Sequence, residues 1–317
     1  MQNTASSSGV KKGLFIIPYA QLSNYQTGVN LNGSKDYVKM YLKNCCVAAL
    51  SAVFNAGAST DVALVTNFDI PAEYRDLLYA NHVIHMKIPF DLFDFGAEYK
   101  WSLAFYKLCV LHHICRETNY DYYAYADSDT YIQSDFSYIW RECDKRILLY
   151  DINHGLQVQH YQHFLEEVTK YSSDLDLITH YGGEFFAASK ENAVEFSCRC
   201  LDVYHNMRQN QIVTTHGDEF IISIVASQLQ NKVKNAGAYI YRFWTGCFRL
   251  ISTNYQFNPV TILHVPNEKR WGMIKLFNYF KKHHHFPTQN KVWRILHLKH
   301  LAFFNVIRRT LKSIMRR

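Results

Sequence analysis

One stretch near the middle of the chain decides the expected fold. It reads Tyr122-Tyr123-Ala124-Tyr125-Ala126-Asp127-Ser128-Asp129. Its first five residues are an aromatic-rich apolar run, which predicts a strand buried on both faces of a sheet. Because the run stops at two carboxylates one residue apart, it directs hard oxygen ligands to the carboxyl edge of the sheet, where α/β folds bind ligands. We expect a divalent cation and a phosphate there.

The segments before this stretch alternate between short apolar runs and helical spacing. Strands are predicted at 13–19, 61–67 and 82–88, and helices at 38–55, 71–79 and 101–115. Strands that alternate with helices predict an α/β fold with a mostly parallel sheet built from right-handed βαβ units.

The second half of the chain is more mixed. We expect a short helix at 136–141, a strand at 147–150 and a helix at 156–170. A turn at 182–183 is expected before an apolar run at 185–188, followed by helices at 191–206 and 220–229 and a strand at 238–243. This half is expected to hold a second substrate.

Charge is distributed unevenly along the 317 residues. The net charge is +7, but residues 269–317 contain 13 Lys and Arg and no acid, whereas residues 1–268 contain the other 21 basic residues and all 27 acids. Such asymmetry suggests a tail that seeks an anionic surface. Neither an 18-residue apolar run nor a signal peptide is present in the sequence, so we expect a cytoplasmic protein.

The eight cysteines fit a reducing compartment. They include no Cys-x-x-Cys pair and no paired zinc spacing. We expect buried or half-buried free thiols.

The central stretch resembles the metal and sugar-nucleotide motif of GT-A-fold glycosyltransferases, an apolar strand followed by Asp-x-Asp. In isolation, two such carboxylates are also ordinary turn residues. The resemblance implies that Asp129 binds Mn²⁺ or Mg²⁺ together with a diphosphate. It also implies that Asp127 contacts both the metal and the donor ribose or sugar.

A second resemblance lies near the carboxyl end, in Ile262-Leu263-His264-Val265-Pro266-Asn267-Glu268-Lys269-Arg270-Trp271. It is similar to the His-x-x-Gly-x-x-Lys-Pro-Trp element of family 8 transferases, the lipopolysaccharide galactosyltransferase and glycogenin group. The resemblance implies that His264 is the third metal ligand and that Lys269 contacts the diphosphate. A purely structural role for His264 is the alternative.

Acidic residues open an amphipathic helix at Asp218-Glu219. They either complement the helix dipole or face the reacting carbon and the acceptor. The pair resembles the Asp-Gln of family 8 and the Asp-Glu of blood-group-type α-1,3-galactosyltransferases. If configuration is inverted, one carboxylate would act as general base; if it is retained, one would stabilise positive charge or position the acceptor.

Tyr181-Gly182-Gly183-Glu184 resembles the Tyr-Gly-Gly segment of the same blood-group-type enzymes. Glycine lets backbone approach a ligand closely, so Gly183 is expected beside the donor sugar. Glu184 is either a contact to sugar hydroxyls or an ordinary turn carboxylate.

Further donor contacts are expected at the ends of other predicted strands and helices. Tyr19 is a candidate to stack on the nucleobase, and Asn67 or Asp69 to bond to it. Lys100 lies at the start of the predicted helix that precedes the Asp-x-Asp strand, and it is expected to face the donor.

The basic tail contains apolar residues at helical spacing, Phe304, Ile307, Leu311 and Ile314, with basic residues between them. This pattern predicts a basic amphipathic helix on an anionic membrane. The competing nucleic-acid interpretation is less favoured, because no nucleic-acid-binding motif accompanies the tail.

Together these features predict a leader at 1–10, a GT-A domain at 11–270 and a membrane-associating tail at 271–317. The expected function is metal-dependent transfer of a sugar from a nucleoside diphosphate, with UDP the expected nucleotide, to a hydroxyl of a glycan or glycolipid, as in surface polysaccharide or lipopolysaccharide synthesis. The protein would sit peripherally on the inner face of a membrane. The alternatives are a non-catalytic GT-A-like binding protein and a metal-dependent phosphoryl hydrolase.

Overall fold

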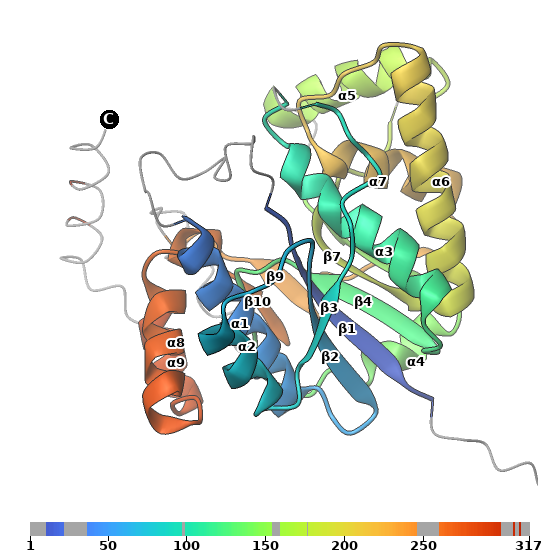
Figure 1. The fold of residues 1–317 in the computed structure, drawn as a ribbon. Coiled ribbons are helices and arrows are strands. Elements are labelled where there is room, and N and C mark those ends of the chain that lie inside the picture. Colours follow the sequence, from blue (N-terminus) through green and yellow to red (C-terminus); the bar gives the residue numbers. More distant parts are fainter. Residues whose placement is uncertain are drawn as a thin grey trace, which may run out of the picture.

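A computed structural model describes residues 11–21, 37–96, 99–153, 159–175, 177–245 and 260–298, together with Ile307 and Leu311. Over these residues the chain forms an α/β fold in which a large, mostly parallel sheet is covered by helices on both faces (Figure 1). The expected α/β class and mostly parallel sheet are confirmed.

The large sheet has the strand order β3-β2-β1-β4-β7-β6-β8. Its strands are β1 (Gly13–Tyr19), β2 (Thr60–Thr66), β3 (Ile84–Lys87), β4 (Tyr122–Ala126), β6 (Ile147–Asp151), β7 (Tyr181–Ser189) and β8 (Val233–Asn235). All neighbours in this sheet pair in parallel except β7, which is antiparallel to β4 and β6. The chain runs outward from β1 to β3 and returns to β4 on the other side of β1. The carboxyl ends of β1 and β4 therefore form a topological switch point, where open α/β sheets bind ligands.

Two groups of helices cover the two faces (Figure 1). One face packs against α1 (Tyr37–Asn55), α2 (Ala72–Tyr79), α4 (Ile139–Cys143), α8 (Gly272–His283) and α9 (Gln289–Ile295). The other packs against α3 (Tyr106–Glu117), α5 (Gln159–Tyr171), α6 (Lys190–Gln209) and α7 (Asp218–Gln228). A 3₁₀ turn, η1 (Ser102–Phe105), leads into α3.

Strand β4 explains why the central stretch is apolar throughout. Tyr122, Ala124 and Ala126 pack into the core on the α1 side, whereas Tyr123 and Tyr125 pack into the core on the α3 side. All five residues are buried. Period-two alternation thus places an apolar side chain in a core on either face, and the first polar side chains come where the strand ends.

A second sheet contains β5 (Thr130–Ile132), β10 (Ile262–His264) and β9 (Ile240–Arg242). Strand β10 pairs antiparallel with β5 and parallel with β9, so that His264 is in register with both Thr130 and Arg242. The backbone N–H of Val265 also donates to the carbonyl of Asp129 at 3.0 Å. This sheet brings the carboxyl-terminal histidine to the end of β4.

Residues after 270 continue the folded domain. Helix α8 packs against α1, and Phe277, Phe280 and Trp293 are buried in the same core as β1 and β4. A short 3₁₀ turn, η4 (Pro266–Glu268), connects β10 to this region. The core therefore does not end at 270. Within the tail, apart from Ile307 and Leu311, the predicted amphipathic helix lies outside the described residues. Among the helices that the structure describes, none has the length and apolar character needed to cross a bilayer.

One local expectation was wrong. Gly182 and Gly183 do not form a turn, because both lie inside the nine-residue strand β7. The strand is nevertheless irregular there: the β6–β7 register shifts between Leu149 and Tyr150, which leaves residues 183–185 of β7 without a partner on β6. The expectation of free, buried or half-buried cysteines is confirmed for the seven in the described part of the chain, six of which are buried. Cys247 lies outside that part.

Candidate functional site

A cavity of about 440 Å³ lies at the switch point between β1 and β4. Its walls come from the ends of these strands, from α1, η1, α3 and α7, and from β7, β9 and β10. Ten of the twelve predicted site residues line it: Tyr19, Lys100, Asp127, Asp129, Gly183, Glu184, Asp218, Glu219, His264 and Lys269. Residues from distant parts of the sequence thus meet in one cavity.

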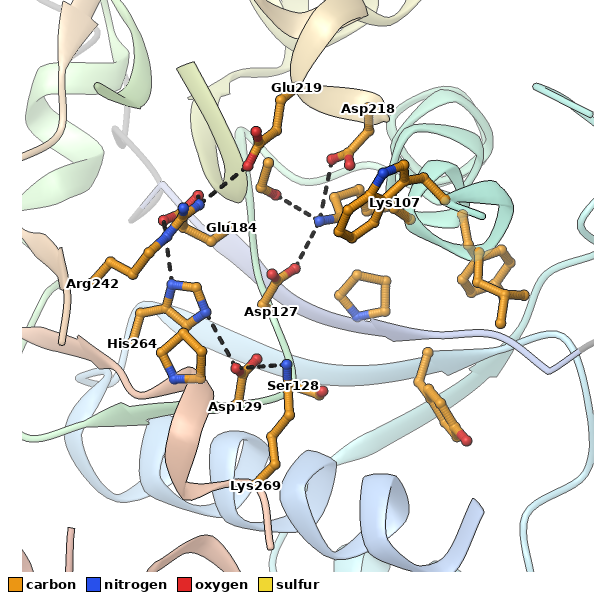
Figure 2. A pocket seen from close by; sticks show the side chains of 18 of the residues that line it. Lys107, Asp127, Ser128, Asp129, Glu184, Asp218, Glu219, Arg242, His264 and Lys269 are labelled. Carbon is orange, nitrogen blue, oxygen red and sulfur yellow. Dashed lines mark hydrogen bonds and ion pairs between the residues drawn. The ribbon is translucent and has the colours of Figure 1, made fainter. Parts of the chain in front are cut away.

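Asp127, Asp129 and His264 form a compact set of possible metal ligands (Figure 2). One ligand atom from each lies within 4.8 Å of the others. Asp129 and His264 are buried, whereas the Asp127 side chain is 30% exposed and faces the cavity. The two carboxylates offer hard oxygen ligands and the imidazole one nitrogen ligand, so the set could hold a divalent cation.

Asp129 is surrounded by positive charge. Its Oδ2 lies 3.0 Å from Lys269 Nζ and 3.3 Å from His264 Nε2, although neither contact has good hydrogen-bond geometry. Burial alone would raise the pKa of Asp129, but Lys269 and His264 outweigh it and hold this pKa well below its usual range. The carboxylate is therefore ionised and has a lone pair to offer a cation.

Glu184 links His264 to the opposite wall. The Glu184 carboxylate receives two hydrogen bonds from the Arg242 guanidinium, both at 2.6 Å, and lies 3.2 Å from His264 Nδ1. Complete burial would raise the pKa of Glu184, but Arg242 and His264 outweigh burial and lower this pKa. Its carboxylate is occupied by protein partners, so Glu184 orients the histidine and is not free for sugar hydroxyls.

Lys107 forms a second charged group in the same cavity (Figure 2). Its ammonium donates to Asp127 Oδ1 at 2.8 Å and to the carbonyl of Gly183 at 2.9 Å, and lies 3.2 Å from Asp218 Oδ2. Burial would lower the pKa of Lys107, but the two carboxylates raise it well above its usual value. One buried cation thus connects the Asp-x-Asp turn to the start of α7.

The two carboxylates at the start of α7 have different surroundings. Burial, aided by repulsion from Glu219 and Asp127, raises the pKa of Asp218 to about 7 in spite of Lys107. Burial would raise the pKa of Glu219, but its contacts with His180 and Arg242, each at 3.2 Å, lower this pKa. At neutral pH, Glu219 is fixed as an anion and Asp218 can exchange a proton.

Close packing explains the two glycines of β7. A Cβ at Gly182 would lie 1.9 Å from Glu184 Oε2, and a Cβ at Gly183 would lie 1.9 Å from Asp218 Oδ2. Neither residue has positive φ. Glycine is required here because side chains of the site pass close to the strand, and not because the chain turns at this point.

Glu167 on α5 binds the loop that precedes α7. The Glu167 carboxylate accepts from Thr214 Oγ1, from the backbone N–H and Oγ1 of Thr215, and contacts His216 Nδ1 at 3.0 Å. Although burial acts in the opposite direction, these donors lower the pKa of Glu167 to about 2. Gly217 then turns the chain into α7 with φ of 62°. This clamp fixes where Asp218 and Glu219 point.

Two predicted residues lie outside the cavity. Asn67 uses its side-chain amide to bind the backbone N–H and carbonyl of Gln21. Asp69 is exposed and forms an ion pair with Lys87 at 2.7 Å. Tyr19 does line the cavity, but its ring stacks on Tyr41 and is only 8% exposed. Each of these polar strand ends is used to hold neighbouring protein.

Sequence reasoning missed Lys107, Arg242 and Tyr41. Lys107 is a single cation in the apolar run from Phe105 to Leu111, and Arg242 is a single cation in an apolar strand. A lone charge at a buried position is a signal of pairing, because unpaired buried charges are costly. Tyr41 carried no comparable signal.

No protein-family model matches this sequence, and a search of curated proteins finds no match to it.

Proposed function

We propose that this protein is a metal-dependent glycosyltransferase of the GT-A type. It would move a sugar from a nucleoside diphosphate, with UDP the expected nucleotide, to a hydroxyl of a glycan or glycolipid. The observation that carries the proposal is the set formed by Asp127, Asp129 and His264 in a cavity at the β1/β4 switch point. The Asp-x-Asp turn at the end of a central strand of a mixed sheet supports the GT-A assignment.

The diphosphate would lie at the end of the cavity that contains Asp127, Asp129, His264 and Lys269. A bound Mn²⁺ or Mg²⁺ would supply Lewis-acid stabilisation of the charge that develops on the leaving diphosphate. Lys269 lies 3.0 Å from Asp129 and lines the cavity, so its ammonium can contact a phosphate oxygen there. Glu184 keeps His264 Nε2 directed toward Asp129.

The nucleoside would lie against Tyr41 and the end of β1. Tyr41 is partly exposed and lines the cavity, with Lys269 Nζ 5.9 Å from its ring centroid. Tyr19 supports Tyr41 from behind by stacking at 5.4 Å between ring centroids. We therefore assign base stacking to Tyr41, in place of Tyr19.

The acceptor would enter beside the start of α7. This wall contains Trp101, His160, His216 and Trp244 together with Asp218 and Glu219. Asp218, with a pKa near 7, is the carboxylate suited to take the proton of an acceptor hydroxyl. Glu219 remains ionised and is suited to stabilise positive charge at the anomeric carbon. The first role belongs to inversion and the second to retention.

A donor screen tests the proposal. The protein would be incubated with UDP-, GDP- and CMP-sugars and Mn²⁺, and binding and donor hydrolysis would be measured. We expect one nucleotide class to bind only with Mn²⁺, and Asp129→Ala and His264→Ala to abolish this binding. Asp69→Asn is the matched control, because Asp69 is an exposed carboxylate outside the cavity. Failure of all donors to bind would overturn the proposal; binding without turnover would instead indicate a non-catalytic binding protein.

We also propose a peripheral position on the inner face of a membrane. Helices α8 and α9 expose five basic side chains, while most of their apolar side chains are buried; the basic residues are Lys275, Lys281, Lys282, Lys291 and Arg294. This basic surface is continuous in sequence with the basic segment 299–317. Such a charge distribution favours anionic lipids, which would bring the enzyme to a glycolipid acceptor.

A further inference from the structure

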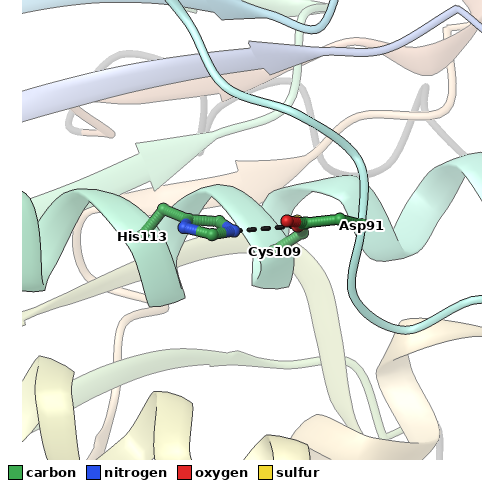
Figure 3. A group of neighbouring side chains, drawn as sticks. All are labelled: Asp91, Cys109 and His113. Atoms are coloured by element: carbon green, nitrogen blue, oxygen red, sulfur yellow. Dashed lines mark hydrogen bonds and ion pairs between the residues drawn. The ribbon is translucent and has the colours of Figure 1, made fainter.

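A second cluster of side chains that could bind a metal lies outside the cavity, where the segment after β3 meets α3 (Figure 3). It contains Cys109 and His113 from α3 and Asp91 from the segment after β3, and none of these residues lines the cavity. Cys109 and His113 are four residues apart, so they lie on the same face of the helix. Figure 3 shows Asp91 reaching this face from the neighbouring segment.

The distances suit one small cation. His113 Nε2 lies 2.9 Å from Asp91 Oδ1, and Cys109 Sγ lies 3.6 Å from the same oxygen. One ligand atom from each residue lies within 4.8 Å of the others. Sulfur, nitrogen and oxygen ligands in tetrahedral zinc sites are separated by about 3 to 4 Å, given metal–ligand bonds of roughly 2.0 to 2.3 Å.

Glu117 completes the arrangement. It lies one further turn along α3, and its Oε1 is 3.1 Å from His113 Nδ1. A carboxylate on the far ring nitrogen directs the other nitrogen toward the cluster, as is usual for histidines that bind metals. The Asp91 side chain is 51% exposed, so a fourth position is open to water.

We propose that Asp91, Cys109 and His113 bind Zn²⁺, with Glu117 orienting His113. A thiolate with an imidazole and a carboxylate selects zinc over Mn²⁺ or Mg²⁺, which prefer oxygen ligands. In the free protein the Cys109 thiol donates to the carbonyl of Pro89 at 3.3 Å. Zinc binding would release this proton to solvent and form the Zn–S bond. The metal would tie the segment after β3 to the helix that carries Lys107.

Cobalt substitution tests the site in the full-length protein, because a thiolate ligand gives Co²⁺ a charge-transfer absorption in the near ultraviolet. We expect this band in the wild type, its displacement by Zn²⁺, and its loss in Cys109→Ala. Asp91→Asn and His113→Gln should weaken Co²⁺ binding, and Glu117→Gln should weaken it about 10- to 100-fold.

Cys115→Ala is the matched control, since Cys115 is also a buried thiol on α3 but is not part of the cluster. It should keep the band. The absence of a sulfur-based band in the wild type, or its survival in Cys109→Ala, would overturn the proposal. Asp91→Asn and His113→Gln change partly exposed side chains, so they keep the test valid if Cys109→Ala fails to fold. The Asp127, Asp129 and His264 set contains no sulfur, so its function is tested independently.

Discussion

The Glu184 carboxylate lies 3.2 Å from His264 Nδ1, and this contact determines which ring nitrogen faces Asp129. Glu184 comes from β7 and His264 from β10, 80 residues later. Arg242 donates one hydrogen bond to each oxygen of the same carboxylate. Glu184 therefore orients His264, the proposed metal ligand, and Arg242 in turn holds Glu184 in place.

Glu184→Gln should weaken Mn²⁺ binding about 10- to 100-fold, because an amide orients His264 less strongly than a carboxylate. It also removes a buried charge partner of Arg242, so stability should fall by about 3–5 kcal/mol. Calorimetric titration and thermal unfolding would measure the two effects. Glu219→Gln is the control, since Glu219 contacts Arg242 and His180, whereas the ring nitrogens of His264 face Glu184 and Asp129. Equal losses of Mn²⁺ affinity in both variants would contradict the positioning role.

Asp218→Asn should change the dependence of stability on pH. The pKa of Asp218 is about 7 in the folded protein and 3.8 without the fold, so the folded state binds the proton more tightly. The free energy of unfolding of the wild type, relative to that of the variant, should therefore be highest below pH 4 and should fall as pH rises through 7. The change should amount to at most about 4 kcal/mol. Denaturant unfolding in EDTA at several pH values would measure it.

The same variant tests catalysis. If Asp218 takes the proton from the acceptor hydroxyl, the rate of sugar transfer by the wild type should rise as pH increases through about 7. The Asp218→Asn variant should be slow and show no such rise. An unchanged pH profile in the variant would assign the proton transfer to another group.

Gly183→Ala should disturb the site more than the fold. The added Cβ would lie 1.9 Å from Asp218 Oδ2 and 3.1 Å from Lys107 Nζ, so both side chains must move. We expect a stability loss of about 1–3 kcal/mol and a larger relative loss of transfer activity. Gly237→Ala is the control, because its nearest neighbour is Asn235 Oδ1 at 3.2 Å, outside the cavity. Normal activity of Gly183→Ala would show that Asp218 is not needed in its present position.

Glu167→Gln should loosen the loop that leads into α7. An amide cannot accept from Thr214, Thr215 and His216 as a carboxylate does, and hydrogen bonds to charged groups contribute about 1.5–3 kcal/mol each. We expect faster amide hydrogen exchange at 214–219 and slower transfer, with Mn²⁺ affinity unchanged. A loss of Mn²⁺ affinity would mean that the change spreads to the metal ligands.

Removal of residues 299–317 should release the protein from vesicles that contain anionic lipid and leave the thermal unfolding temperature unchanged. Removal from residue 276 should instead unfold the domain, because Leu276, Phe277 and Phe280 are buried in the core. Sedimentation with vesicles, at low and high salt, would measure the first effect. If the shorter protein binds as before, the basic surface of α8 and α9 is sufficient and the segment 299–317 is not the anchor.

Much of the fold could be predicted because local patterns and burial agree. The β4 run is apolar at every position since both faces of the sheet are covered, and β1 shows the same pattern. The glycine pair of β7 predicts a turn, but its cause is tertiary packing and not local chain geometry. Their requirement comes from Glu184 and Asp218 passing close to the strand, which no local pattern can express.

By itself, the sequence determined that an apolar strand delivers Asp127 and Asp129 to a sheet edge, because strand periodicity and turn chemistry are local properties. It also indicated His264, Lys269 and the acidic pair at 218–219 as separate candidates. Tertiary structure decided that Glu184 serves His264, that Lys107 connects Asp127 to Asp218, and that Asn67 and Asp69 bind protein neighbours. These outcomes depend on strand order and register, which bring residues far apart in sequence to within a few ångströms, where charge and burial set their roles.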